Sequence, residues 1–155
     1  MATILAHPLE RRLTSPIHLM ALAYWMRCRR LTGGIPGRQH IDPLDIPSLL
    51  PWVNLVDVHR QPDGIAFRHR LVGTGIVEAW DRDSTGHWFH ELYEPRKLAR
   101  IQPTLEQIVG TSEPALISDD LREVGRPYRT ASSLVMPLAS DGRLVDMLLT
   151  VSQYD

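Results

Sequence analysis

Residues 52–73 read WVNLVDVHRQPDGIAFRHRLVG, and this stretch decides the fold. Two β-rich runs flank the turn Gln61-Pro-Asp-Gly64, and an Asp-Gly pair between such runs is a strong signal for a β-hairpin. In the second run, apolar and basic residues alternate with a period of two, as expected for a strand with one buried face. We therefore expect an antiparallel hairpin formed by residues 52–59 and 65–73. Its core-facing side chains on the second strand include Phe67, His69 and Leu71.

The chain after this hairpin predicts a block of helices followed by a second group of strands. Residues 74–94 predict short helices broken at Asp83–Gly86, and Pro95 opens a longer helix that ends at Gly110. Pro103 should kink or restart that helix. Three further strands are expected at residues 115–124, 128–138 and 144–154. Helices inserted into an otherwise antiparallel sheet, covering one of its faces, define an α+β domain.

The chain before the hairpin predicts one helix over residues 17–31, with Ser15-Pro16 at its start and Gly33-Gly34 at its end. This helix is apolar on nearly all sides, so it needs cover on nearly all sides. One side can pack on its own domain, and we expect the other to form a homodimer interface. The interface residues predicted on this basis are Leu19, Leu22, Ala23 and Met26. Residues 1–34 would then form an N-terminal arm and docking helix, and residues 35–155 the domain itself.

Composition indicates a globular protein. Of 155 residues, 43% are apolar and 23% charged, and one domain of this length can bury a real core. No signal peptide or run long enough to cross a membrane is evident, and Cys28 has no intrachain partner, so we expect a reducing, cytoplasmic setting.

Charge is distributed unevenly along the chain. Residues 1–38 contain six arginines and one acidic residue, a charge of +5, whereas the rest contains 11 basic and 17 acidic residues, a charge of −6. A basic arm can bind nucleic acid or an anionic membrane surface. The alternative, which we favour, is that the arm packs on an acidic surface of its own chain or of a second copy. No nucleic acid or membrane partner is therefore expected.

The order of predicted elements and several short motifs together resemble a family of small bacterial single-domain PAS-like proteins. No single motif is specific, but their order and spacing are. The matching pieces are Tyr24-Trp25, Pro36-Gly-Arg38, Ile41-Asp42-Pro43, Leu49-Leu50-Pro51, Arg70-Leu-Val-Gly73-Thr74, Asp83-Ser-Thr85-Gly86, Met136-Pro-Leu and Asp141-Gly142. The resemblance implies a five-stranded antiparallel sheet cupped by short helices, with a cavity between them. It also implies a sensory module that binds a small molecule, or a dimerisation module.

Motifs for cofactor chemistry and catalysis are not found. A flavin photoreceptor of this fold would need a cysteine in the helix block, but Cys28 is in the N-terminal helix, and the helix expected to carry a haem ligand, residues 95–110, has no histidine. His87 and His90 lack further ligands at a recognised zinc spacing. Gly73-Thr-Gly75 lacks the third glycine of a phosphate-binding loop, and no Gly-x-Ser-x-Gly elbow occurs. We therefore expect no cofactor, no metal and no catalytic residues.

His69 is the polar residue of greatest interest, because its strand face should look into the core. A few polar groups on an apolar wall are typical of a small-molecule pocket. Alternatively, His69 can be a hydrogen-bonded core residue that lines nothing. The predicted ligand-binding residues are Phe67, His69, Leu71, Trp80, Phe89, Thr130, Ser132 and Met147.

Three functions remain open at this point. The first is a sensory or regulatory module, with no output domain in the chain, that binds a small molecule, a signalling protein or both. The second is a ligand-free dimerisation or adaptor module. The third and least favoured is a cavity enzyme in which His69 acts as general base, oriented by Asp57 or Asp146.

Overall fold

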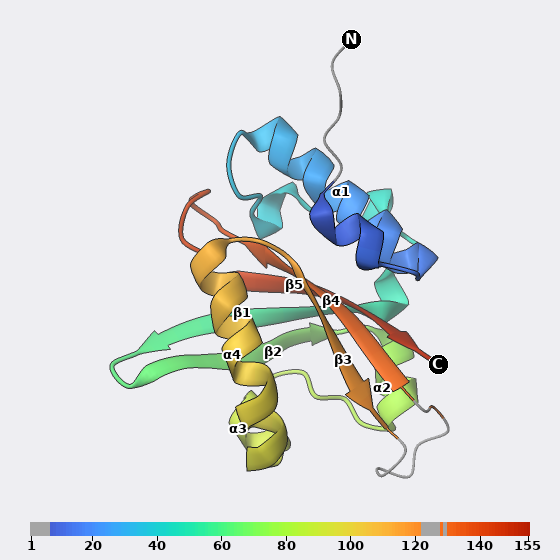
Figure 1. Cartoon of the computed structure of the whole chain (residues 1–155), viewed down its shortest axis with the longest axis vertical. Coiled ribbons are helices and arrows are strands. Elements are labelled where there is room, and N and C mark those ends of the chain that lie inside the picture. Colours follow the sequence, from blue (N-terminus) through green and yellow to red (C-terminus); the bar gives the residue numbers. More distant parts are fainter. Residues whose placement is uncertain (1–6, 122–127, 129) are drawn as a thin grey trace.

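The computed structural model describes residues 7–121, 128 and 130–155, and in this part of the chain five strands form one antiparallel sheet (Figure 1). The order across the sheet is β2-β1-β5-β4-β3. The strands are β1 (Val53–Gln61), β2 (Gly64–Val72), β3 (Ala115–Asp120), β4 (Thr130–Leu138) and β5 (Met147–Tyr154). The predicted hairpin is confirmed, and so is the α+β class with its five-stranded antiparallel sheet.

The α-helices of the described residues lie on both faces of this sheet. They are α1 (Pro16–Thr32), α2 (Thr74–Trp80), α3 (Phe89–Leu92) and α4 (Pro95–Thr111). Short 3₁₀ turns precede α1 and connect it to β1: η1 (Pro8–Arg12), η2 (Arg38–His40), η3 (Pro43–Asp45) and η4 (Leu50–Trp52). Helix α4 is continuous through Pro103, so the predicted restart at this proline is wrong. Strand β5 begins at Met147, three residues later than expected, and part of the predicted third strand lies outside the described residues.

Two hydrophobic clusters divide the core, one on each face of the sheet. Alternate residues of β4 supply both: Leu134 and Met136 pack with α1, whereas Val135 packs on the other face with Ile101 and Leu105 of α4. Each face of the sheet is therefore apolar, because each is covered by a helix.

Trp25 anchors α1 to the sheet. Its side chain is fully buried, and its indole Nε1 donates a hydrogen bond of 2.8 Å to the carbonyl oxygen of Pro137 in β4. Burial of an aromatic residue removes a large apolar surface from water, and the hydrogen bond satisfies the indole N–H that burial would otherwise leave unpaired.

Within the region where β1 and β2 pair, β2 contains one residue more than β1. Leu55 pairs with Leu71 and the next residue of β1, Val56, pairs with His69, so that Arg70 is the extra residue of a β-bulge. Side chains normally alternate between faces along a strand. The bulge breaks this alternation, and His69 and Leu71 therefore lie on opposite faces of the sheet.

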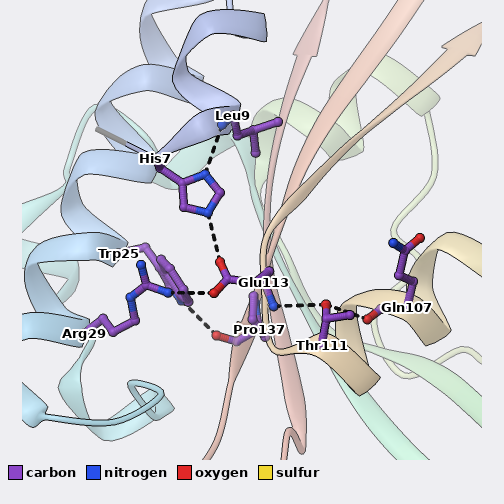
Figure 2. A network of polar contacts seen from close by, with 8 residues as sticks. All are labelled: His7, Leu9, Trp25, Arg29, Gln107, Thr111, Glu113 and Pro137. Carbon is purple, nitrogen blue, oxygen red and sulfur yellow. Dashed lines mark hydrogen bonds and ion pairs between the residues drawn. The ribbon is translucent and has the colours of Figure 1, made fainter. Parts of the chain in front are cut away.

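The N-terminal segment and α1 also contact the end of α4 through Glu113 (Figure 2). One carboxylate oxygen of Glu113 lies 2.9 Å from Nε2 of His7, and the other accepts a hydrogen bond of 3.1 Å from Nη1 of Arg29. The Arg29 guanidinium also lies over the ring of Trp25, 4.6 Å from its centroid. One arginine of the basic segment thus pairs with an acidic residue of the same chain.

Candidate functional site

A cavity lies between the sheet and helices α2, α3 and α4. Its volume is about 440 Å³. Apolar side chains from the sheet and from α4 form much of the wall, among them Val56, Ile101, Leu105 and Leu148. The volume is within the range of pockets that hold small molecules, roughly 300 to 1,000 Å³.

His69, Asn54 and Tyr93 form a hydrogen-bonded trio on the cavity wall. Nε2 of His69 lies 2.9 Å from the hydroxyl oxygen of Tyr93, and Nδ1 lies 3.0 Å from Nδ2 and 3.2 Å from Oδ1 of Asn54. The ring of Phe89 packs 4.6 Å from the His69 ring, centroid to centroid. Asn54 and His69 come from adjacent strands, and Tyr93 directly follows α3.

Burial keeps His69 neutral. Burial, together with the nearby Arg82, His87 and Lys97, lowers the pKa of His69 to about 4, and burial is the largest of these causes. Burial also raises the pKa of Tyr93 well above its usual value. Near pH 7 the trio is therefore uncharged, and it can act as a hydrogen-bond donor or acceptor.

A second group of polar side chains lines the cavity along β4 and β5. The hydroxyl oxygens of Ser133 and Ser152 lie 2.8 Å apart, and Thr150 is buried on the same face of β5. Near them, Nε1 of Trp80 donates a hydrogen bond of 2.8 Å to the hydroxyl of Tyr154. The cavity wall thus combines apolar surface with a few fixed polar groups.

Charged side chains surround the cavity on α4 and β3. Nζ of Lys97 lies 3.6 Å from Asp119, which also accepts a hydrogen bond from Arg100. The ammonium group of Lys97 lies over the rings of Tyr93 and Trp80, at 4.5 and 5.2 Å from their centroids. Arg82, Glu94 and Asp120 also line the cavity.

Of the predicted ligand-binding residues, His69, Trp80 and Phe89 line this cavity. Phe67 is buried and packs on Phe89, with 5.7 Å between ring centroids, but it lines a separate hollow beside α4. Placing Leu71 in the pocket is wrong. The bulge at Arg70 turns Leu71 to the opposite face, where it is 47% exposed, and Val72 lines the cavity instead.

Placing Thr130, Ser132 and Met147 in the pocket is also wrong, because the alternate residues of β4 and β5, and not these, face the cavity. Thr130 is exposed, and Met147 packs against the cluster under α1. The residues of these strands that line the cavity are Ala131, Ser133, Val135, Leu148, Thr150, Ser152 and Tyr154.

Four further cavity residues were not expected from the sequence, namely Asn54, Arg82, Tyr93 and Lys97. A usable signal existed for two of them. Asn54 is polar at a position two residues before Val56 on the same strand face, and Tyr93 follows Phe89 by four residues, which places both on one side of a helical turn.

The dimer interface predicted on α1 is wrong for two of its four residues. Leu22 is fully buried and Met26 is 8% exposed within the single chain, because the side of α1 that carries them packs on the sheet. Leu19 is 39% exposed and Ala23 is also exposed, and Met20 beside them is 50% exposed.

The arrangement required by the enzyme hypothesis is not present. Asp57 lies 3.7 Å from Arg70, and Asp146 binds Ser140, so neither carboxylate orients His69. Within residues 7–121, 128 and 130–155, no three His, Cys, Asp or Glu side chains gather closely enough to hold a metal ion. No helix in this part of the chain is long and apolar enough to cross a membrane.

A five-stranded antiparallel sheet with helices inserted between its second and third strands, enclosing a cavity, defines an α+β domain of the PAS type. The model of the PAS domain family matches residues 13–151. The chain therefore belongs to the PAS domain family. No curated protein matches the sequence.

Proposed function

We propose that this PAS domain is a sensory or regulatory module that binds a small molecule in the cavity between the sheet and α2–α4. The observation that carries the proposal is the neutral trio of His69, Asn54 and Tyr93 on the wall of a 440 Å³ cavity. Polar groups held at fixed positions on an apolar wall give a ligand both affinity and orientation. His69 serves here as a ligand contact, since a histidine with a pKa of about 4 is a weak general base near pH 7.

Ligand binding can be passed to a protein partner through α4. Arg100, Ile101 and Leu105 of α4 line the cavity, and Glu113, two residues past the end of this helix, is bonded to Arg29 of α1. If α4 can adopt two placements on the sheet, a ligand that binds one placement more tightly would increase the population of that placement. The exposed side of α1 would then present the change to a partner.

The test fills the cavity with a side chain and follows binding of N-phenyl-1-naphthylamine, an uncharged probe whose fluorescence rises in apolar sites. Ala131→Phe directs a large ring into the cavity, whereas Thr130→Phe changes the neighbouring exposed position. The probe should bind the wild type and Thr130→Phe and fail to bind Ala131→Phe. Equal binding to all three proteins would refute the cavity as the ligand site.

Homodimerisation through α1 is a second candidate function. It is favoured by the exposed apolar side chains of Leu19 and Met20. Burying such a surface against a second copy would remove apolar area from water. Light scattering of the wild type and of a Leu19→Glu, Met20→Glu variant tests this. A dimer that becomes a folded monomer in the variant supports the function, and a wild-type monomer at micromolar concentration counts against it.

A further inference from the structure

Some of the charged side chains around the cavity form ion pairs with one another, and in the part of the chain that the structure describes one of the cations does not. Asp119 is shared by Lys97 and Arg100, so one carboxylate faces two cations. Arg82 lines the same cavity, and within the described residues its guanidinium makes no hydrogen bond or ion pair. Glu94 is exposed at the start of α4, and Asp120 is exposed at the end of β3.

The charges that act on His69 are basic, although Asp119 acts on Tyr93 with the opposite sign. Besides burial, every group that lowers the pKa of His69 is a cation or a histidine, namely Arg82, His87 and Lys97. Arg82 also lowers the pKa of Tyr93, although burial outweighs this effect. Because Asp119 is already paired with Lys97 and Arg100, an anion beside His69 on the side of Arg82 would meet a favourable potential, strengthened because part of the site is removed from water.

The trio can also turn a hydrogen-bond donor toward an anion. Both amide atoms of Asn54 lie within reach of Nδ1 of His69, so either tautomer of the ring can be paired. When the proton is on Nε2, His69 donates to the hydroxyl oxygen of Tyr93 and accepts from Nδ2 of Asn54. The Tyr93 O–H is then available to donate to a bound ligand.

We propose that the ligand of this cavity is a small organic anion. Its acidic group lies between Arg82 and Lys97 and accepts a hydrogen bond from Tyr93, and its apolar body extends toward Leu105 and Leu148. The proposal rests on the cavity being a small-molecule site and adds the chemical class of the molecule. The neutral state of His69 leaves Arg82 and Lys97 as the countercharges for the acidic group.

Two probes of almost identical shape test this class directly. Anilinonaphthalene-8-sulfonate carries one sulfonate, and N-phenyl-1-naphthylamine is the same molecule without it. Both are titrated into the wild type, Arg82→Gln and Arg96→Gln, the last removing an exposed α4 arginine that does not line the cavity. Loss of one charge-assisted hydrogen bond is expected to weaken anion binding by about tenfold.

Arg82→Gln is expected to weaken binding of the sulfonate probe by about tenfold and to change the affinity for the uncharged probe by less than about twofold. Arg96→Gln is expected to change neither affinity. Equal losses in Arg82→Gln and Arg96→Gln would show a general charge effect and overturn the anion site. In a third outcome, Ala131→Phe abolishes binding of the uncharged probe, but Arg82→Gln does not weaken binding of the sulfonate probe. This outcome would overturn the ligand class and leave the cavity as a small-molecule site. Binding of neither probe to the wild type would overturn both.

Discussion

The guanidinium Nη1 of Arg29 in α1 lies 3.1 Å from Oε1 of Glu113, in the segment that joins α4 to β3. Helices α1 and α4 lie on opposite faces of the sheet, and β3 is an edge strand, so this ion pair connects the two faces around the edge. His7 occupies the other oxygen of the same carboxylate (Figure 2). Glu113 is thus a shared point of contact for the N-terminal segment, α1 and the end of α4.

Replacing Glu113 with Gln should loosen the N-terminal segment while changing global stability by less than about 1 kcal/mol. The side chain of Glu113 is 50% exposed, and solvent screens such pairs. Amide hydrogen exchange should therefore accelerate at residues 9–13 rather than in the sheet. Glu106→Gln is the control, because Glu106 is an exposed α4 residue paired only locally with Gln102 in the described structure. Unchanged exchange at residues 9–13 would contradict the role of Glu113.

His69 should make the protein less stable as pH falls from about 6.5 to about 4. Its folded-state pKa is lowered to about 4, so the unfolded chain takes up the proton first, and acid favours unfolding across this window. The contribution of this one group reaches about 3 kcal/mol at the low end of the window.

Urea unfolding of the wild type and His69→Gln at several pH values between 7 and 4 measures this effect, and the variant should lose less stability across the window. Burial also lowers the pKa of His18, so the variant should retain part of the slope. Parallel stability curves for the two proteins would show that His69 does not titrate with a lowered pKa.

Trp25→Phe should destabilise the protein by about 1 to 3 kcal/mol, because it leaves the buried carbonyl oxygen of Pro137 without its donor. Tyr24→Phe is the matched control: the hydroxyl that it removes donates to Asp45 and accepts from the backbone N–H of Asp42, both at exposed positions that water can satisfy, so it should cost less than about 1 kcal/mol. Chemical denaturation of both variants compares the two costs. Similar losses for both would contradict Trp25 as the anchor of α1.

Two glycine substitutions should change stability in opposite directions. A Cβ at Gly73 would lie 2.4 Å from the carbonyl oxygen of Pro51 and 2.5 Å from that of Leu50, and backbone atoms cannot move aside cheaply. A Cβ at Gly110, in α4, would meet nothing within 4 Å. Gly73→Ala should therefore lower the thermal unfolding temperature, and Gly110→Ala should raise stability by about 0.4 to 1 kcal/mol. A stable Gly73→Ala protein would show that η4 and β2 can separate.

The hairpin and the general fold were predictable because their signals are local. The Pro62-Asp63-Gly64 turn and the alternation before His69 specify β1 and β2 within one short stretch. The side of the sheet that holds the cavity was harder to predict. Leu134 and Val135 are both buried, one on each face, so hydrophobicity alone does not distinguish the cavity face.

The two faces of α1 posed the same difficulty, since the helix is apolar on most of its circumference. Leu22 and Met26 were expected to face a second subunit, but they pack on the sheet with Trp25. The bulge in β2 could not be recognised from residue types either. Its extra residue, Arg70, continues the alternation of basic and other residues along the strand. Backbone irregularities of this kind depend on pairing with β1, which sequence periodicity does not record.

The extra residue in β2 also sets the direction in which the chain leaves the sheet. With the strand advanced by one position, Gly73 lies against η4, and α2 begins at once at Thr74. Ile76 and Trp80 of that helix then reach the cavity wall. The single extra residue Arg70 therefore determines where α2 begins relative to β1. Through α2 it also determines the position of Trp80 on the cavity wall.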